Sequence, residues 1–221
     1  MERAPGRIHA AHVFPAIVLL FVVQPALAAL SATATDFLVV LLALTLAVGI
    51  WSLDGGRTWT RVGVAISAAA ALTVIAQRIA PRLAFVVAGT LWLDLLGLLC
   101  VLLGIRWLAS SRRITLESLL AAISLYVLLA IVFAMLALGI FVLDPGAYHG
   151  LSESGRSKEV AELVYFSIGT LTGTAYGDIL PTGPLSRLLA NAEAVTGQMY
   201  MAVLVAMLVS NYVAGRSAEG S

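Results

Sequence analysis

The sequence predicts an all-α, polytopic membrane protein with six transmembrane helices. Of its 221 residues, 61% are hydrophobic and 11% are charged, whereas a typical soluble domain carries about 25% charged residues. A helix needs about 20 mostly apolar residues to cross a bilayer. The chain contains six stretches of this kind, and one further apolar segment that is too short to cross. The composition argues against a water-soluble fold.

The six predicted spans are separated by short breaks that are rich in Gly, Pro, Asp and Arg, which is turn chemistry. No break is long enough to separate soluble domains. The first four spans define a four-helix membrane domain, residues 1–113. The spans are residues 13–30, 36–53, 62–80, 83–108, 116–143 and 192–213.

The basic residues predict the orientation. With six spans and the amino terminus inside, more Arg and Lys residues fall on the inner side than on the outer side, as cytoplasmic loops require. We therefore expect a multi-pass protein of the plasma membrane, the inner membrane of the cell, with both termini in the cytoplasm. Alternatively, Arg3, Arg7, the apolar run after them and the small residues 26–34 also fit a cleaved signal peptide. That interpretation leaves five spans.

Charge and motifs narrow the class of function. The net charge is +1 and no acidic or basic block is present, so neither nucleic acid nor an acidic partner is indicated. Paired-His metal spacing, a phosphate-binding glycine loop and a Gly-x-Ser-x-Gly elbow are all missing from the sequence. We therefore expect no enzyme, no bound cofactor and no small-molecule substrate. The expected surrounding is the lipid bilayer.

The short apolar segment, residues 159–172, lies between the last two spans. Apolar segments of this length are typical of re-entrant helices. The chain after it has to return at membrane depth without being helical, and such backbone survives only where protein or a water-filled path covers it. The segment therefore predicts a cavity.

A motif begins in the last residues of this segment and continues beyond it. The motif is preceded by an aromatic pair, Tyr165 and Phe166, and by Ser167, and it is followed by Pro181. The last span contains Glu193 and a Gly197-Gln198 pair. The motif reads Thr170-Leu171-Thr172-Gly173-Thr174-Ala175-Tyr176-Gly177-Asp178.

These residues resemble the potassium-channel family and its bacterial relatives, which show Thr-Leu-Thr-Thr-Val-Gly-Tyr-Gly-Asp at this place. The resemblance implies a homotetramer around a central cation pore. It makes residues 114–221 a pore domain, with an outer helix at 116–143, a pore helix at 159–172, a filter at 173–178 and an inner helix at 192–213. In this family, backbone carbonyls replace the hydration shell of the ion.

The resemblance also implies a role for single residues. Asp178 stands at the outer mouth, and Tyr165, Phe166 and Thr172 support the filter. Gly197 is a candidate hinge of the inner helix, with close helix packing as the alternative. The ion-conducting filter residues are Gly173, Thr174, Ala175, Tyr176 and Gly177.

Two filter positions depart from the family pattern. Gly173 replaces a threonine whose hydroxyl adds a ring of oxygens in the family. Ala175 stands where a left-handed glycine is expected, and a Cβ there costs about 1–2 kcal/mol. We therefore expect a relaxed filter with fewer or displaced carbonyl sites. Gly169 replaces a glutamate that braces the aspartate in some relatives, so Asp178 is expected to face the outer vestibule freely.

Three functions remain open. The overall pattern favours passive conduction of potassium, without a cofactor. The altered filter favours a weakly selective channel that also passes sodium or divalent cations. A membrane scaffold that keeps the fold but does not conduct is the third. The spacing of Gly169, Gly173 and Gly177 by four also occurs where membrane helices pack together, but the Tyr-Gly-Asp sequence favours the pore.

The fourth predicted span differs from that of voltage-gated relatives, because it lacks arginines at every third position. It contains Asp94 instead, about 16 Å along the helix from Leu83, close to the expected bilayer midplane. A carboxylate is unfavourable there unless it is protonated or hydrogen-bonded. Asp94 is therefore a candidate gating residue, with a structural contact to Ser67 or Thr73 as the alternative.

Overall fold

The computed structural model describes residues 56–79, 83–110, 116–152 and 155–219. The first two predicted spans, residues 13–30 and 36–53, lie outside the described residues. The signal-peptide alternative concerns the same part of the chain. The described part is mostly helical and contains five α-helices.

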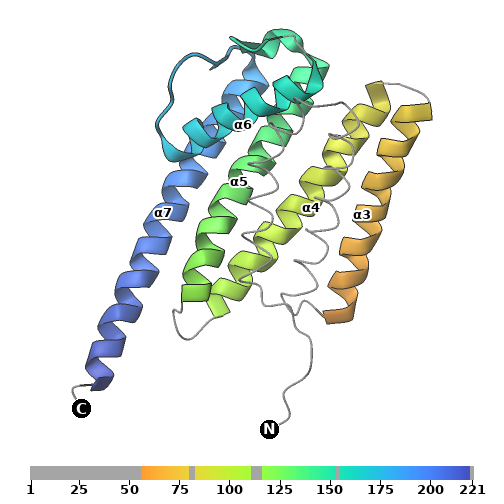
Figure 1. The fold of residues 1–221 in the computed structure, drawn as a ribbon. Helices are drawn as coiled ribbons and strands as arrows, with labels where there is room; N and C mark the ends of the chain where they lie inside the picture. The colour runs from red at the N-terminus through yellow and green to blue at the C-terminus, as the bar shows by residue number, and fades with distance from the viewer. Residues whose placement is uncertain (1–55, 80–82, 111–115, 153–154, 220–221) are drawn as a thin grey trace.

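Three long helices lie side by side, with α4 between α3 and α5, and a fourth long helix, α7, packs against α5 (Figure 1). The short helix α6 lies at one end of this arrangement, where it contacts both α5 and α7. In chain order the elements are α3 (Gly56–Ile79), α4 (Leu83–Ser110), α5 (Leu116–Leu143), η1 (Pro145–Ala147), β1 (Tyr148–His149), α6 (Arg156–Thr172), β2 (Leu180–Pro181) and α7 (Pro184–Glu219).

Two described helices are long and apolar enough to cross a membrane. They contain the segments Val87–Arg106 of α4 and Ser118–Leu143 of α5. Helix α5 covers the same residues, 116–143, that the apolar pattern predicts. The predicted span at 62–80 lies largely in α3, which contains the apolar segment Arg61–Thr73.

Three helices begin earlier than predicted, and one of them is α3, which begins at Gly56 rather than at residue 62. The short helix begins at Arg156 rather than at residue 159, and the last helix begins at Pro184 rather than at residue 192. The predicted bounds follow the apolar run, whereas a helix continues into polar residues outside it. Proline is suited to the first turn, because its missing N–H has no partner there in any case.

Two clusters of buried side chains hold the helices together. One joins α4 to α5 and extends to Leu171 of α6. The other joins the end of α5 to α6, η1 and β1, and includes Leu163 of α6. Leu163 and Leu171 are almost completely buried. Apolar packing therefore holds α6 at its middle and near its C-terminal end.

A small antiparallel sheet closes the end of the molecule at which α6 lies. Tyr148 pairs with Pro181 and His149 pairs with Leu180. The backbone N–H of Thr182 donates to the carbonyl of Ala147 at 2.9 Å. The chain that returns from α6 is therefore attached to the segment that leaves α5.

Gly97 of α4 tests the contact between α4 and α5. A Cβ built there lies 2.7 Å from Cγ2 of Val132, and valine is stiff in a helix. We expect Gly97→Ala to destabilise the protein by about 1–3 kcal/mol, the usual range for overpacking. The measurement is thermal unfolding in detergent, followed by tryptophan fluorescence.

Gly139→Ala of α5 is the matched control, because a Cβ at Gly139 meets nothing within 4 Å. Equal unfolding midpoints for Gly97→Ala and Gly139→Ala would contradict the described packing of α4 on α5.

Candidate functional site

The candidate site is the loop of residues 173–178 together with the helix that carries it, α6. Helix α6 has 17 residues and ends at Thr172. Gly173 caps it in the left-handed conformation, with φ of 78°, and its N–H donates to the carbonyl of Thr170. A glycine in this conformation is a common helix end, because it has no Cβ penalty. The loop therefore starts at a defined stop.

The middle of α6 is attached by a buried hydroxyl. Ser167 Oγ lies 2.8 Å from the carbonyl oxygen of Ala130 on α5, and it also contacts Oε1 of Glu193 on α7. Ser167 is completely buried and Glu193 is 2% exposed. One side chain of α6 thus joins both neighbouring helices.

The last turn of α6 is attached by a tyrosine. The hydroxyl of Tyr126 on α5 donates to the carbonyl of Leu171 at 3.0 Å. Its ring packs against that of Tyr200 on α7, with centroids 5.3 Å apart. The hydroxyl of Tyr200 in turn donates to the carbonyl of Ala122 at 2.6 Å. The two rings therefore bridge α5 and α7 below the loop.

Gly197 of α7 lies against the same turn of α6. A Cβ built on Gly197 lies 2.0 Å from the carbonyl oxygen of Leu171, closer than two such atoms can come. This contact accounts for a glycine at position 197 by close packing. The hinge interpretation of Gly197 is not needed to explain the residue.

Aromatic rings flank the loop on its outer side. Tyr165 of α6 and Tyr176 of the loop are stacked, with centroids 5.2 Å apart and an interplanar angle of 12°. Phe166 does not share this stack but meets Tyr148 edge-on at 5.7 Å. The aromatic pair therefore divides: Tyr165 contacts the loop, and Phe166 packs into the core beside β1.

The backbone of the loop alternates in handedness. Residues 173, 175 and 177 have positive φ angles of 78°, 43° and 84°. Ala175 therefore has the left-handed conformation that the family pattern expects of a glycine. Its N–H donates to the carbonyl of Gly169 at 3.1 Å, which holds this residue against α6.

Gly173 and Thr172 have a local role in this geometry. The left-handed end of α6 favours glycine at position 173. A Cβ at this position would also lie 3.1 Å from Nε2 of Gln198 on α7. Thr172 donates to the carbonyl of Ile168 at 2.7 Å, and its hydroxyl lies 3.0 Å from that of Thr174. The two threonines thus brace the inner end of the loop.

Asp178 is exposed but it is not free. Its Oδ1 accepts a hydrogen bond from the N–H of Ile179 at 3.0 Å, and its carboxylate interacts with the hydroxyl of Tyr165. Gly150 approaches the carbonyl of Asp178 so closely that a Cβ would lie 2.1 Å away. Asp178 thus has partners within its own chain, and its position at the outer vestibule stays a prediction.

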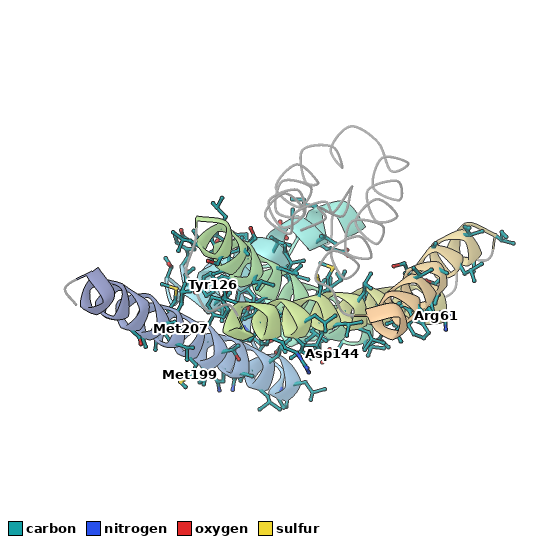
Figure 2. All side chains as sticks on the ribbon, turned by 90° about the horizontal axis from the view of Figure 1, so that it is seen from below. Arg61, Tyr126, Asp144, Met199 and Met207 are labelled. Carbon is teal, nitrogen blue, oxygen red and sulfur yellow. The ribbon has the colours of Figure 1, made fainter. Side chains whose placement is uncertain are left out.

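Asp94 lies apart from the loop, on a cavity of about 750 Å³ between α4, α5 and α7, along which Met199 and Met207 of α7 lie (Figure 2). It is 7% exposed, and its Oδ1 has no hydrogen-bond partner in the described part of the chain. The hydroxyls of Ser67 and Thr73 donate to carbonyls of their own helix, those of Gly63 and Ala70. A structural contact of Asp94 to Ser67 or Thr73 therefore stays an alternative to a role in gating.

Sequence reasoning missed the buried contacts of Tyr126, Tyr200 and Glu193. Glu193 carried a signal, since an acidic residue inside an apolar span calls for a partner. The partners could not be named, because 26 and 45 residues separate Ser167 from Glu193 and Tyr126 from Leu171. Among the described residues, no group of three His, Cys, Asp or Glu side chains could hold a metal ion.

The strain at Ala175 can be tested by two substitutions with opposite effects. Ala175→Gly removes a Cβ from a left-handed residue and should stabilise each chain by about 1–2 kcal/mol. Gly173→Thr adds a β-branched side chain at a φ of 78° and should destabilise it by a similar or larger amount. Thermal unfolding in detergent measures both. A Gly173→Thr protein more stable than the unmodified chain would contradict the described loop.

Residues 121–214 match the model of a protein family described as "Ion channel". The match covers most of α5, all of α6, the loop and most of α7. Among curated proteins and among solved structures, none matches the chain. Together with the two apolar helices, the family match supports an ion channel that resides in a membrane and associates with other subunits, and it favours transport over catalysis.

Proposed function

We propose that the chain forms a homotetrameric cation channel and that residues 173–178 are its selectivity filter. Passive conduction of potassium is the favoured activity. The observation that carries this proposal is the alternation of positive and negative φ along the loop. In an ordinary strand, successive carbonyls point to opposite sides, whereas alternating handedness turns them to the same side.

The hydrogen bonds of the loop support a direction for these carbonyls. The N–H of Ala175 points back to the carbonyl of Gly169 on α6, so the opposite side of the loop is left for carbonyl oxygens. A row of carbonyl oxygens is what replaces the hydration shell of a potassium ion. The carboxyl end of α6 also favours cations at the loop, because this end of a helix carries partial negative charge.

A single chain cannot surround an ion, and the exposure of the loop fits this requirement. Tyr176 is 67% exposed and Tyr165 is 40% exposed in the single chain. We propose that neighbouring subunits cover them. Four loops around one axis would then form the conducting path, with four Asp178 carboxylates at its outer mouth.

The remaining arrangement follows from the same proposal. Residues 1–113 form a four-helix domain and residues 114–221 form the pore domain, in which α6 is the pore helix and α7 is the inner helix. The channel lies in the plasma membrane with six spans and both termini in the cytoplasm. Asp94, beside the cavity next to α7, is proposed as a gating residue. No resident cofactor is proposed.

A weakly selective channel, which passes sodium or divalent cations as well, is the second candidate. The observation that favours it is the left-handed Ala175, whose strain is multiplied by four in a tetramer and reaches about 4–8 kcal/mol in total. Relief of this strain would displace carbonyl oxygens from the positions that favour potassium. The two candidates differ in ion preference rather than in architecture.

Bi-ionic reversal potentials of the purified protein in lipid bilayers test the proposal. With potassium on one side and sodium on the other, we expect a potential that shows potassium preference. A potential near zero would indicate the weakly selective channel. The absence of current at varied pH, lipid composition and calcium concentration would contradict conduction and would favour a membrane scaffold.

Ala175→Gly is the informative variant in this measurement, because it restores glycine without disturbing the helix end at Gly173. We expect it to increase the preference for potassium over sodium. The double change Gly173→Thr with Ala175→Gly is less informative, since the φ of 78° at position 173 disfavours threonine. An unchanged reversal potential in Ala175→Gly would show that this residue does not set ion preference.

A further inference from the structure

A buried carboxylic acid joins the helix that carries the loop to the last helix of the chain. Glu193 of α7 is 2% exposed, and its Oε1 contacts the hydroxyl of Ser167 on α6, which is completely buried. Nothing in the conduction mechanism above uses this acid. An acidic group in such a place is unfavourable unless its surroundings compensate it.

The surroundings of Glu193 favour the neutral acid. No cationic side chain among the described residues pairs with it. The neighbouring titratable group is Tyr148 of β1, and burial raises the pKa of this hydroxyl, so it also stays neutral. Among the described residues of α5 and α6, the acid contacts the hydroxyl of Ser167, and this hydroxyl contacts the carbonyl of Ala130. A buried carboxylate with no cation would be strongly disfavoured.

The hydrogen bonds have one consistent direction when Glu193 is neutral. The carbonyl of Ala130 can only accept, so the hydroxyl of Ser167 donates to it at 2.8 Å. The proton between Ser167 and Glu193 then comes from the acid. The resulting series of hydrogen bonds runs from Glu193 of α7 through Ser167 of α6 to Ala130 of α5. Each hydroxyl proton in this series has one acceptor.

The contact between Glu193 and Ser167 lies close enough to the loop to affect the position of the loop. Ser167 and Leu171 lie on one face of α6, one turn apart, and Glu193 and Gly197 lie one turn apart on α7. Glu193 meets Ser167, and Gly197 meets Leu171. Two contacts in register therefore fix α6 along α7, and Leu171 is followed within one turn by the loop.

Resting on the proposed function, we propose that Glu193 is a positioning residue of the ion pathway. As a neutral acid it holds α6 on α7 through Ser167, so that the position of α7 determines whether the loop conducts. Loss of this hydrogen bond lets α6 shift against α7 and closes the path at the loop.

Two substitutions of Glu193 separate the hydrogen bond from simple packing. Glu193→Gln keeps a donor of similar size, whereas Glu193→Met keeps length and volume but has no donor. In flux assays with purified protein in potassium-loaded liposomes, we expect Glu193→Gln to stay close to the unmodified rate. Glu193→Met should lose flux at least about tenfold, which corresponds to about 1.4 kcal/mol. Val64→Met, at an exposed site of α3 outside the pore domain, is the matched control and should leave flux unchanged.

Oligomer size, measured by size exclusion with light scattering, must be the same in all these proteins for the comparison to count. A Glu193→Met protein that conducts like the unmodified chain overturns the proposal. So does a Glu193→Gln protein that is as impaired as Glu193→Met. If Glu193→Met does not assemble, Ser167→Ala replaces it, since it removes the same link from the other helix with a smaller change.

Two measurements do not depend on conduction and therefore separate this proposal from the proposed function. Infrared spectra near neutral pH should show the C=O stretch of a protonated carboxylic acid, and this band should be lost in Glu193→Gln but kept, at least in part, in Asp94→Asn. Thermal unfolding of Ser167→Ala, Glu193→Met and the double variant should show non-additive destabilisation, because both changes remove one interaction.

The outcomes are distinct. A protein that passes no ion overturns the proposed function and, with it, the role of Glu193 in conduction. A band that survives in Glu193→Gln, or strictly additive destabilisation, overturns the neutral link itself, whatever the flux.

Discussion

The structure depends on how a helix too short to cross a membrane is held at one depth. Helix α6 has 17 residues and ends in an exposed loop, so its own length cannot fix its position. Three attachments do so at successive levels: the stack of Tyr165 on Tyr176, the buried hydroxyl of Ser167, and the hydrogen bond from Tyr126 to Leu171. Each uses α5, α7 or the loop itself. The loop is therefore only as well placed as the helices around α6.

The sequence predicted the apolar elements well and their polar ends poorly. The pattern predicts α5 at the residues observed, and its end coincides with the change from apolar Leu143 to Asp144. Helices α6 and α7 begin earlier than predicted, since their first turns are polar yet helical. The roles of single loop residues stay predictions, although the left-handed backbone at Ala175 fits the resemblance on which they rest. The contact between Glu193 and Ser167 could not be predicted from the sequence, because it depends on how α6 and α7 pack together.

Small residues in this part of the chain serve distinct physical purposes. Gly173 provides a left-handed helix end, Gly197 allows α7 to touch the carbonyl of Leu171, and Gly150 allows β1 to approach Asp178. Ala175 has the conformation of a glycine without the freedom of one. A family pattern alone would treat Gly173 and Ala175 as equivalent departures. The backbone angles separate them, since a threonine would be strained at position 173 and a glycine would be relaxed at position 175.

The central claim is that cations pass the outer end of this loop, and Asp178→Cys tests it most directly. Cys100 is the native cysteine of the chain and is buried, so thiol reagents should act at the new site. After labelling of the channel in planar bilayers, an anionic thiol reagent should raise the potassium current and a cationic reagent of the same size should lower it. Equal currents after complete labelling with either reagent would contradict the claim that residue 178 lies at the mouth of a cation path.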